Sequence, residues 1–117
     1  MTVTVTVEGE SFGVGDTVEV VVRNGLEQSV WTHDQMSWCS IVSIDRWDGA
    51  AWVRVGECAT TAPRLVVALA RASDHRILLA PGAEARGTCR ASLVYSPDEG
   101  FSFASARMAV SETFTIE

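Results

Sequence analysis

The sequence predicts an all-β domain in which short antiparallel strands form a sandwich or a small barrel. The first observation is the alternation of threonine and valine over residues 2–7, which puts one residue type on each face of an extended strand. The second is the spacing of glycine, proline, asparagine and aspartate, which interrupt the apolar segments about every 8–12 residues. The third is the lack of a long amphipathic helical pattern.

Two more strands are expected in the first third of the chain. Valines alternate with polar residues over 17–23, directly after the turn sequence GVGD at 13–16. This strand is expected to stop at Asn24-Gly25, because asparagine and glycine favour turns. A shorter strand is expected over residues 29–32.

The segment 39–58 predicts a β-hairpin whose turn is formed by Asp48 and Gly49. Asp-Gly suits a two-residue type I′ turn, in which both central residues need positive φ. Trp47 then lies opposite Ala50, and every other pair of facing residues follows from that register.

The same register accounts for the two cysteines at the ends of the segment. It places Ile44 opposite Val53 and Cys39 opposite Cys58. Facing residues in antiparallel strands are close enough for a disulfide, so a Cys39–Cys58 bond is expected. Cys89 shares a strand face with apolar residues and is expected to be a buried free thiol, with an intermolecular disulfide as the alternative.

The second half of the chain also has strand patterns. Residues 63–71 form either a strand or a short helix that starts at Pro63. A strand from residue 76 is expected to end at Pro81-Gly82, and others are expected over 89–95, from 101 and over 113–116. The residues expected in the core are Val5, Val20, Ile44, Val53, Leu93 and Phe114.

Length and charge narrow the possible architectures and partners. The 117 residues fit a single domain over 1–117, for which seven to nine strands favour an immunoglobulin-like antiparallel β-sandwich. The net charge of −6 argues against nucleic acid or an anionic membrane as a partner. No segment approaches the roughly 20 apolar residues that cross a bilayer, so no membrane insertion is expected. The first ten residues lack the basic and apolar regions of a signal peptide.

Several short motifs, in their order along the chain, resemble a bacterial immunoglobulin-like domain of exported proteins and lipoproteins. They are RNGL at 23–26, Cys39, DRWDGAAW at 45–52, Cys58, APG at 80–82 and VSETFTIE at 110–117. The chain differs at 100–105, where GFSFAS replaces a Gly-Thr-Tyr-Arg-like strand. The resemblance implies an accessory or interaction module outside the cytoplasm, whether secreted, at the cell surface or attached to a lipoprotein, with no catalysis of its own.

Catalytic and metal-binding patterns are lacking. His33 and His75 each adjoin an aspartate, but no G-x-S-x-G motif accompanies them. The cysteines and histidines have no C-x₂₋₄-C or H-x₃₋₅-H spacing, which argues against zinc. PDEG at 97–100 holds too few acidic oxygens for calcium. No enzyme activity, metal or cofactor is therefore expected.

Four tryptophans lie close together in the sequence, and two or three of them can fill the sandwich. Trp52 is expected in the core. The segment 27–38 is expected to be an exposed binding loop, since loops on a rigid scaffold often carry recognition. The candidate binding residues in it are Trp31, His33, Asp34 and Trp38.

The sequence therefore favours a non-catalytic, extracytoplasmic module that acts as a spacer or binds a protein partner. One alternative is a proteinase-inhibitor-like protein that acts through the 27–38 loop. Another is a carbohydrate-binding module that uses exposed tryptophans.

Overall fold

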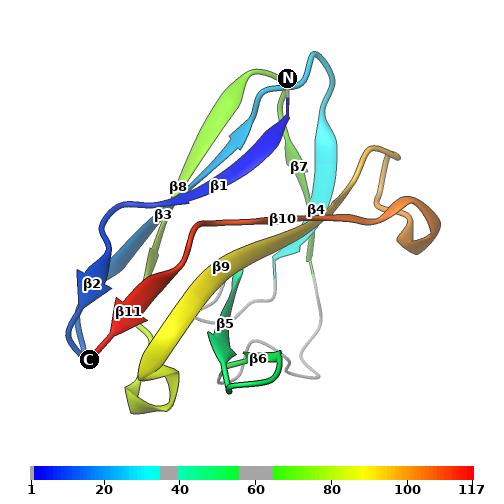
Figure 1. Cartoon of the computed structure of the whole chain (residues 1–117). Coiled ribbons are helices and arrows are strands. Elements are labelled where there is room, and N and C mark those ends of the chain that lie inside the picture. Colours follow the sequence, from blue (N-terminus) through cyan, green and yellow to red (C-terminus); the bar gives the residue numbers. More distant parts are fainter. Residues whose placement is uncertain (1, 35–39, 56–64) are drawn as a thin grey trace.

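The computed structural model describes residues 2–34, 40–55 and 65–117 of the chain, and these residues form a β-sandwich (Figure 1). The smaller sheet has the strand order β1-β3-β8. The larger sheet follows the path β2-β11-β9-β4-β7, and β5, β6 and β10 are attached to it. The predicted all-β sandwich is confirmed.

The described residues contain eleven strands and two 3₁₀ turns. Their bounds are β1 Val3–Val7, β2 Ser11–Phe12, β3 Val18–Asn24, β4 Val30–Asp34, β5 Ser43–Trp47, β6 Trp52–Arg54, β7 Leu65–Leu69, β8 Ser73–Leu79, η2 Ala83–Ala85, β9 Gly87–Ser96, η3 Phe103–Ser105, β10 Arg107–Val110 and β11 Phe114–Ile116.

Strand β9 is the long central strand of the larger sheet, and both of its neighbours are interrupted. On one side it pairs with β10 and then β11, and on the other with β4 and then β5. The break between β10 and β11 has a local cause, because the Ser111 hydroxyl accepts the Ala91 N–H at 2.9 Å in place of a backbone carbonyl. These interruptions raise the number of strands above the seven to nine expected.

The Thr-Val alternation builds the core as expected. In β1, Val3 and Val5 are buried while Thr4 and Thr6 are exposed, and in β3 the alternating Val18, Val20 and Val22 are likewise buried. The core prediction is confirmed for Val5, Val20, Ile44, Leu93 and Phe114, which are at most 6% exposed.

Val53 was also expected in the core, and that prediction is wrong, because its side chain is 44% exposed. Val53 lies opposite Arg46 in the β5–β6 hairpin, whose tip extends beyond the sandwich (Figure 1). Val55, directly after β6, is buried instead, and it donates its N–H to the Ile44 carbonyl at 2.9 Å.

The hairpin forms, but its turn lies one residue later than expected. Trp47 faces Trp52 instead of Ala50, and the Asp48 N–H donates to the Ala51 carbonyl at 3.1 Å. Gly49 has φ of 101° whereas Ala50 has negative φ, so the two central residues are not the type I′ pair. The cause is the Asp48 carboxylate, which accepts the N–H groups of Ala50 and Ala51, each at 2.8 Å.

The corrected register removes the pairing that placed the two cysteines opposite each other. Cys39 and Cys58 themselves lie outside the described residues, so the disulfide stays a prediction.

The backbone hydrogen bonds from Ala51 and Ala50 also lower the pKa of Asp48, because they stabilise its charged form.

The structure also decides two other predictions of secondary structure, at residues 65–69 and from residue 101. Residues 65–69 form strand β7, which pairs with β4, so the strand alternative was correct. The extended segment expected from residue 101 is wrong: η3 occupies Phe103–Ser105, and the strand starts at Arg107.

Asn24 joins the two sheets at one end of the sandwich. Its fully buried side-chain amide donates to the carbonyls of Gln28, Leu69 and Ala70 at 2.9–3.2 Å, and its Oδ1 accepts the Leu26 N–H at 3.0 Å. One side chain thus links the β3–β4 turn to the β7–β8 turn.

At the other end of the sandwich the last strand, β11, meets β2 and the turn that follows it (Figure 1). Strand β2 pairs with β11 in parallel. The Val14 N–H donates to the Glu117 carbonyl at 3.0 Å, and the Glu117 N–H donates to the Phe12 carbonyl at 2.8 Å. Phe12 also packs edge-on against Phe114, with 5.7 Å between ring centroids.

Asn24→Ala should lower the free energy of unfolding by about 2–4 kcal/mol, because one buried and three partly buried backbone groups lose their partner. Urea denaturation followed by circular dichroism measures the change. Gln28→Ala is the matched control, since that side chain is exposed and only its carbonyl takes part. Equal, small effects of both variants would contradict the linking role of Asn24.

Candidate functional site

Strand β4 places His33 on the outer face of the larger sheet. Val30 and Thr32 are buried, while Trp31 and His33 alternate with them and are half-buried. The Thr32 hydroxyl donates to the Val94 carbonyl at 2.7 Å, which holds β4 against β9.

A second element, the loop between β9 and β10, brings two phenylalanines to His33. The Ser96 hydroxyl accepts the N–H groups of Asp98 and Ser102 at 3.1 and 3.2 Å. The Ser105 hydroxyl donates to the Asp98 carboxylate at 2.6 Å and lies 2.8 Å from that of Ser96. Because these bonds cross the loop, its backbone is held in one conformation.

Phe101 has a left-handed backbone conformation, with φ of 70°, which is uncommon for a bulky residue. Its N–H donates to the Asp98 carbonyl at 3.0 Å. This conformation aims its ring at His33, and the ring centroids are 4.4 Å apart. Phe103 meets the Phe101 ring edge-on at 5.0 Å and lies 6.0 Å from His33.

A small pocket of about 140 Å³ opens beside these rings. Its wall combines apolar groups with hydroxyl, imidazole and guanidinium groups. The lining residues are Thr32, His33, Ile41, Ser43, Arg54, Ser92, Val94, Phe101 and Phe103.

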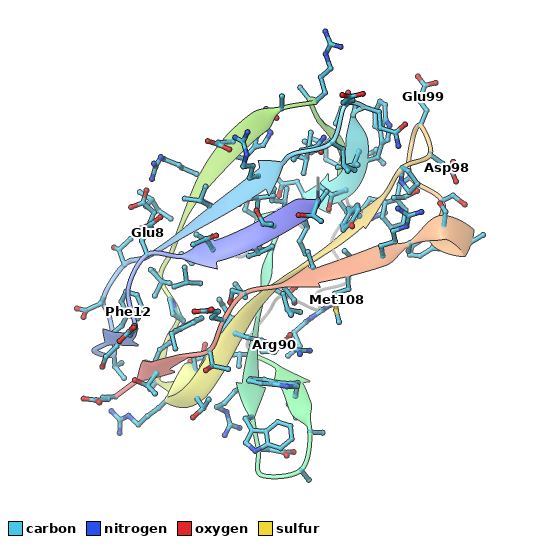
Figure 2. The ribbon with its side chains drawn as sticks, turned by 45° about the horizontal axis from the view of Figure 1, so that its top comes forward. Glu8, Phe12, Arg90, Asp98, Glu99 and Met108 are labelled. Carbon is cyan, nitrogen blue, oxygen red and sulfur yellow. The ribbon has the colours of Figure 1, made fainter. Side chains whose placement is uncertain are left out.

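The apolar surface continues from the pocket onto β10. Met108 lies directly opposite Val94 and is 57% exposed, and Val110 is 44% exposed two residues along the same strand face. Figure 2 shows Met108 extending from β10 on the side away from β1. Phe103 is 75% exposed. We call this surface the aromatic face: His33, Val94, Phe101, Phe103, Met108 and Val110.

A second cluster lies nearby, where β9 meets the β5–β6 hairpin. Arg90 donates through Nε to the buried Asp45 carboxylate at 3.1 Å, and its guanidinium carbon lies 4.6 Å from the ring centre of Trp52 (Figure 2). Trp52 also meets Trp47 edge-on at 5.4 Å. These contacts fix the hairpin on the sheet, which gives the cluster a structural role.

The predicted binding residues have different outcomes. Trp31 and His33 share the outer face of β4, whereas alternation along the strand turns Asp34 the other way. Trp38 lies outside the described residues. The prediction of a binding loop is wrong for 30–34, which form a strand whose backbone pairs with β7 and β9.

The prediction for Trp52 is also wrong, because that side chain is half-buried instead of being in the core. The sequence reasoning missed Phe101 and Phe103. Their spacing of two residues after a turn was the available signal, although nothing local connects them to His33.

The possible metal ligands are scattered over the described residues. They contain no group of three or more histidine, cysteine, aspartate or glutamate side chains arranged to hold a metal ion. His33 and His75 belong to different sheets, on β4 and β8. Asp98, in the PDEG segment that holds too few acidic oxygens for calcium, accepts a hydrogen bond from Ser105.

Cys89 is a buried free thiol, as expected. It donates to the Ala85 carbonyl at 3.0 Å, and burial raises the pKa of the thiol to about 11. The thiol is therefore protonated at neutral pH and is a poor nucleophile.

No family model matches the chain, and no curated protein matches its sequence. No helix among residues 2–34, 40–55 and 65–117 is long and apolar enough to cross a membrane.

The unfolding free energy should fall as pH rises from 9 toward 11. The pKa of the Cys89 thiol is about 9.0 in the unfolded chain and about 11 in the folded one, so the unfolded chain loses this proton first. The Cys89→Ala variant should show a flatter decline over this range, even if it is less stable throughout. Urea denaturation at several pH values measures both slopes. The chain has no lysine, so few other groups titrate there. Identical slopes for the two proteins would contradict the assignment.

Proposed function

We propose that this chain is a non-catalytic interaction domain that binds a protein partner through the aromatic face. The observation that carries the proposal is the continuous exposed apolar surface around the His33 pocket. Exposed apolar groups that gather in one place, with polar groups at their margin, are typical of interaction sites.

The size of the pocket favours a protein partner over a small molecule. Pockets for small molecules typically have volumes of about 300–1,000 Å³, whereas this one has about 140 Å³. Such a pocket fits one side chain of a partner. Inserted side chains of this kind often provide most of the binding energy of an interface.

The rigidity of the β9–β10 loop also supports binding. The bonds among Ser96, Asp98 and Ser105 hold Phe101 and Phe103 in place before any partner arrives. A preorganised aromatic surface loses less conformational entropy on association. Neighbouring His33 and Arg54 add polar groups that can select a partner.

We also propose an immunoglobulin-like arrangement. The order β1-β3-β8 corresponds to strands A, B and E of that fold, and the order β11-β9-β4 to G, F and C. In this comparison β5 continues C after an interruption. The pairing of β2 with β11 supports the same arrangement, since β2 is the part of the first strand that changes sheets.

An extracytoplasmic location remains part of the proposal. It is supported by the motif resemblance and depends on a Cys39–Cys58 disulfide, because such bonds persist in oxidising compartments. Non-reducing peptide mapping of protein made under oxidising conditions should recover the two cysteines in one linked pair and Cys89 free. Three free thiols, or a link to Cys89, would remove this support.

The binding proposal predicts that Phe103→Ala weakens partner binding by about 2 kcal/mol or more, roughly 30-fold in Kd. Leu78→Ala is the matched control, because Leu78 is 68% exposed but lies on the smaller sheet. Quantitative affinity enrichment from the source cells, followed by titration of the enriched protein, measures the effect. A partner that binds wild type and both variants equally, or loses both equally, would contradict the proposal.

A further inference from the structure

The two sheets leave an open seam where β1 and β10 lie side by side (Figure 1). Within the described part of the chain, β1 pairs with β3 alone and β10 with β9 alone, so each strand has a free edge. A groove of about 1050 Å³ runs between them, lined by β1 and by residues 108–110 of β10. This groove shares no lining residue with the His33 pocket, although Met108 and Val110 of the aromatic face also line the groove.

Hydrogen bonds at the two ends of β1 show which backbone groups reach its free edge. The Glu8 N–H donates to Glu19, and the Thr2 carbonyl accepts the Gly25 N–H, so the even-numbered residues bond to β3. Hydrogen-bonded and non-hydrogen-bonded pairs alternate in antiparallel strands. The N–H and C=O groups of Val3 and Val5 therefore point into the seam.

The edge of β1 has none of the usual protection against pairing with another strand. Exposed edges are normally defended by charged residues, proline or bulges. Residues 2–7 contain only threonine and valine, and β1 keeps a regular ladder with β3 over its whole length.

We propose that two copies of this chain associate through antiparallel pairing of their β1 strands. The interface is isologous, since each copy contributes the same edge around a two-fold axis. The pairing joins the two small sheets into one continuous sheet and satisfies backbone groups that otherwise bond to water.

The hydrogen bonds select one register. With Thr4 on the two-fold axis, Val3 lies opposite Val5 of the second copy, and both residues use their N–H and C=O groups. A register centred on Val5 would instead need Val7, whose carbonyl already accepts the Gly9 N–H at 3.1 Å. In the Thr4 register valines continue the core face and threonines the outer face, and β-branched pairs of this kind stabilise sheets.

The charges favour a second copy in this orientation. The acidic end of the seam carries Glu8, Glu10 and Glu112, and Figure 2 shows Glu8 at that end of β1. Arg107 starts β10 at the opposite end, because β10 leads into β11 in the same direction as β1 leads into β2. A two-fold axis therefore sets the basic end of one seam toward the acidic end of the other and separates the like-charged ends.

The test is sedimentation equilibrium of the purified chain and of Thr4→Lys, which sets two lysines directly opposite each other in the dimer. Wild type should be a dimer at high concentration, and Thr4→Lys should dimerise at least about tenfold more weakly. Thr88→Lys is the matched control, because Thr88 is also an exposed strand threonine but lies on β9. It should dimerise as wild type does.

Amide hydrogen exchange followed by NMR tests the register. The Val3 and Val5 amides should exchange slowly in the wild-type dimer, and fast on dilution or in Thr4→Lys. A monomer at millimolar concentration would overturn the proposal, as would a dimer that Thr4→Lys leaves unchanged or fast exchange of both amides in the dimer. If Thr4→Lys proves unfolded by circular dichroism, the wild-type exchange data alone decide.

Discussion

The hydrogen bonds of Asn24 are the constraint on which the relation of the two sheets depends. Strand β3 belongs to the smaller sheet and β4 to the larger, so the turn between them must change layers within a few residues. Strands β7 and β8 make the same change in the opposite direction. One buried amide bonds to carbonyls of both crossings, and the buried Leu69 carbonyl among them would otherwise lack a partner.

This anchoring also explains why the candidate site is preorganised. Asn24 fixes the β3–β4 turn, and strand β4 leads from that turn to His33. Strand β9 pairs with β4, and the hydrogen bond from Thr32 to the Val94 carbonyl joins the two strands. The loop after β9 then folds back over β4 through its own serine and aspartate bonds. The rings of Phe101 and His33 meet because two separately stabilised elements are attached to one sheet.

The parts of the fold that the sequence predicted are those decided by local pattern. The alternation in residues 2–7 and 17–23 determines which side chains enter the core, and it predicted β1 and β3 correctly. The hairpin register depended on whether Asp48 takes a central turn position or bonds to the two N–H groups that follow, which composition does not decide. The site was beyond prediction because His33 and Phe101 are far apart in sequence and only the pairing of β4 with β9 brings them together.

The parallel pairing of β2 with β11 gives the chain an order of assembly. The ribosome makes Ser11 and Phe12 well before their partners Thr115 and Ile116, because most of the sandwich lies between them in the sequence. The contact between the rings of Phe12 and Phe114 therefore cannot form until the strands between them have been made. During translation residues 11–12 therefore stay unpaired until Phe114–Ile116 have been made, and this edge of the larger sheet can form only after that.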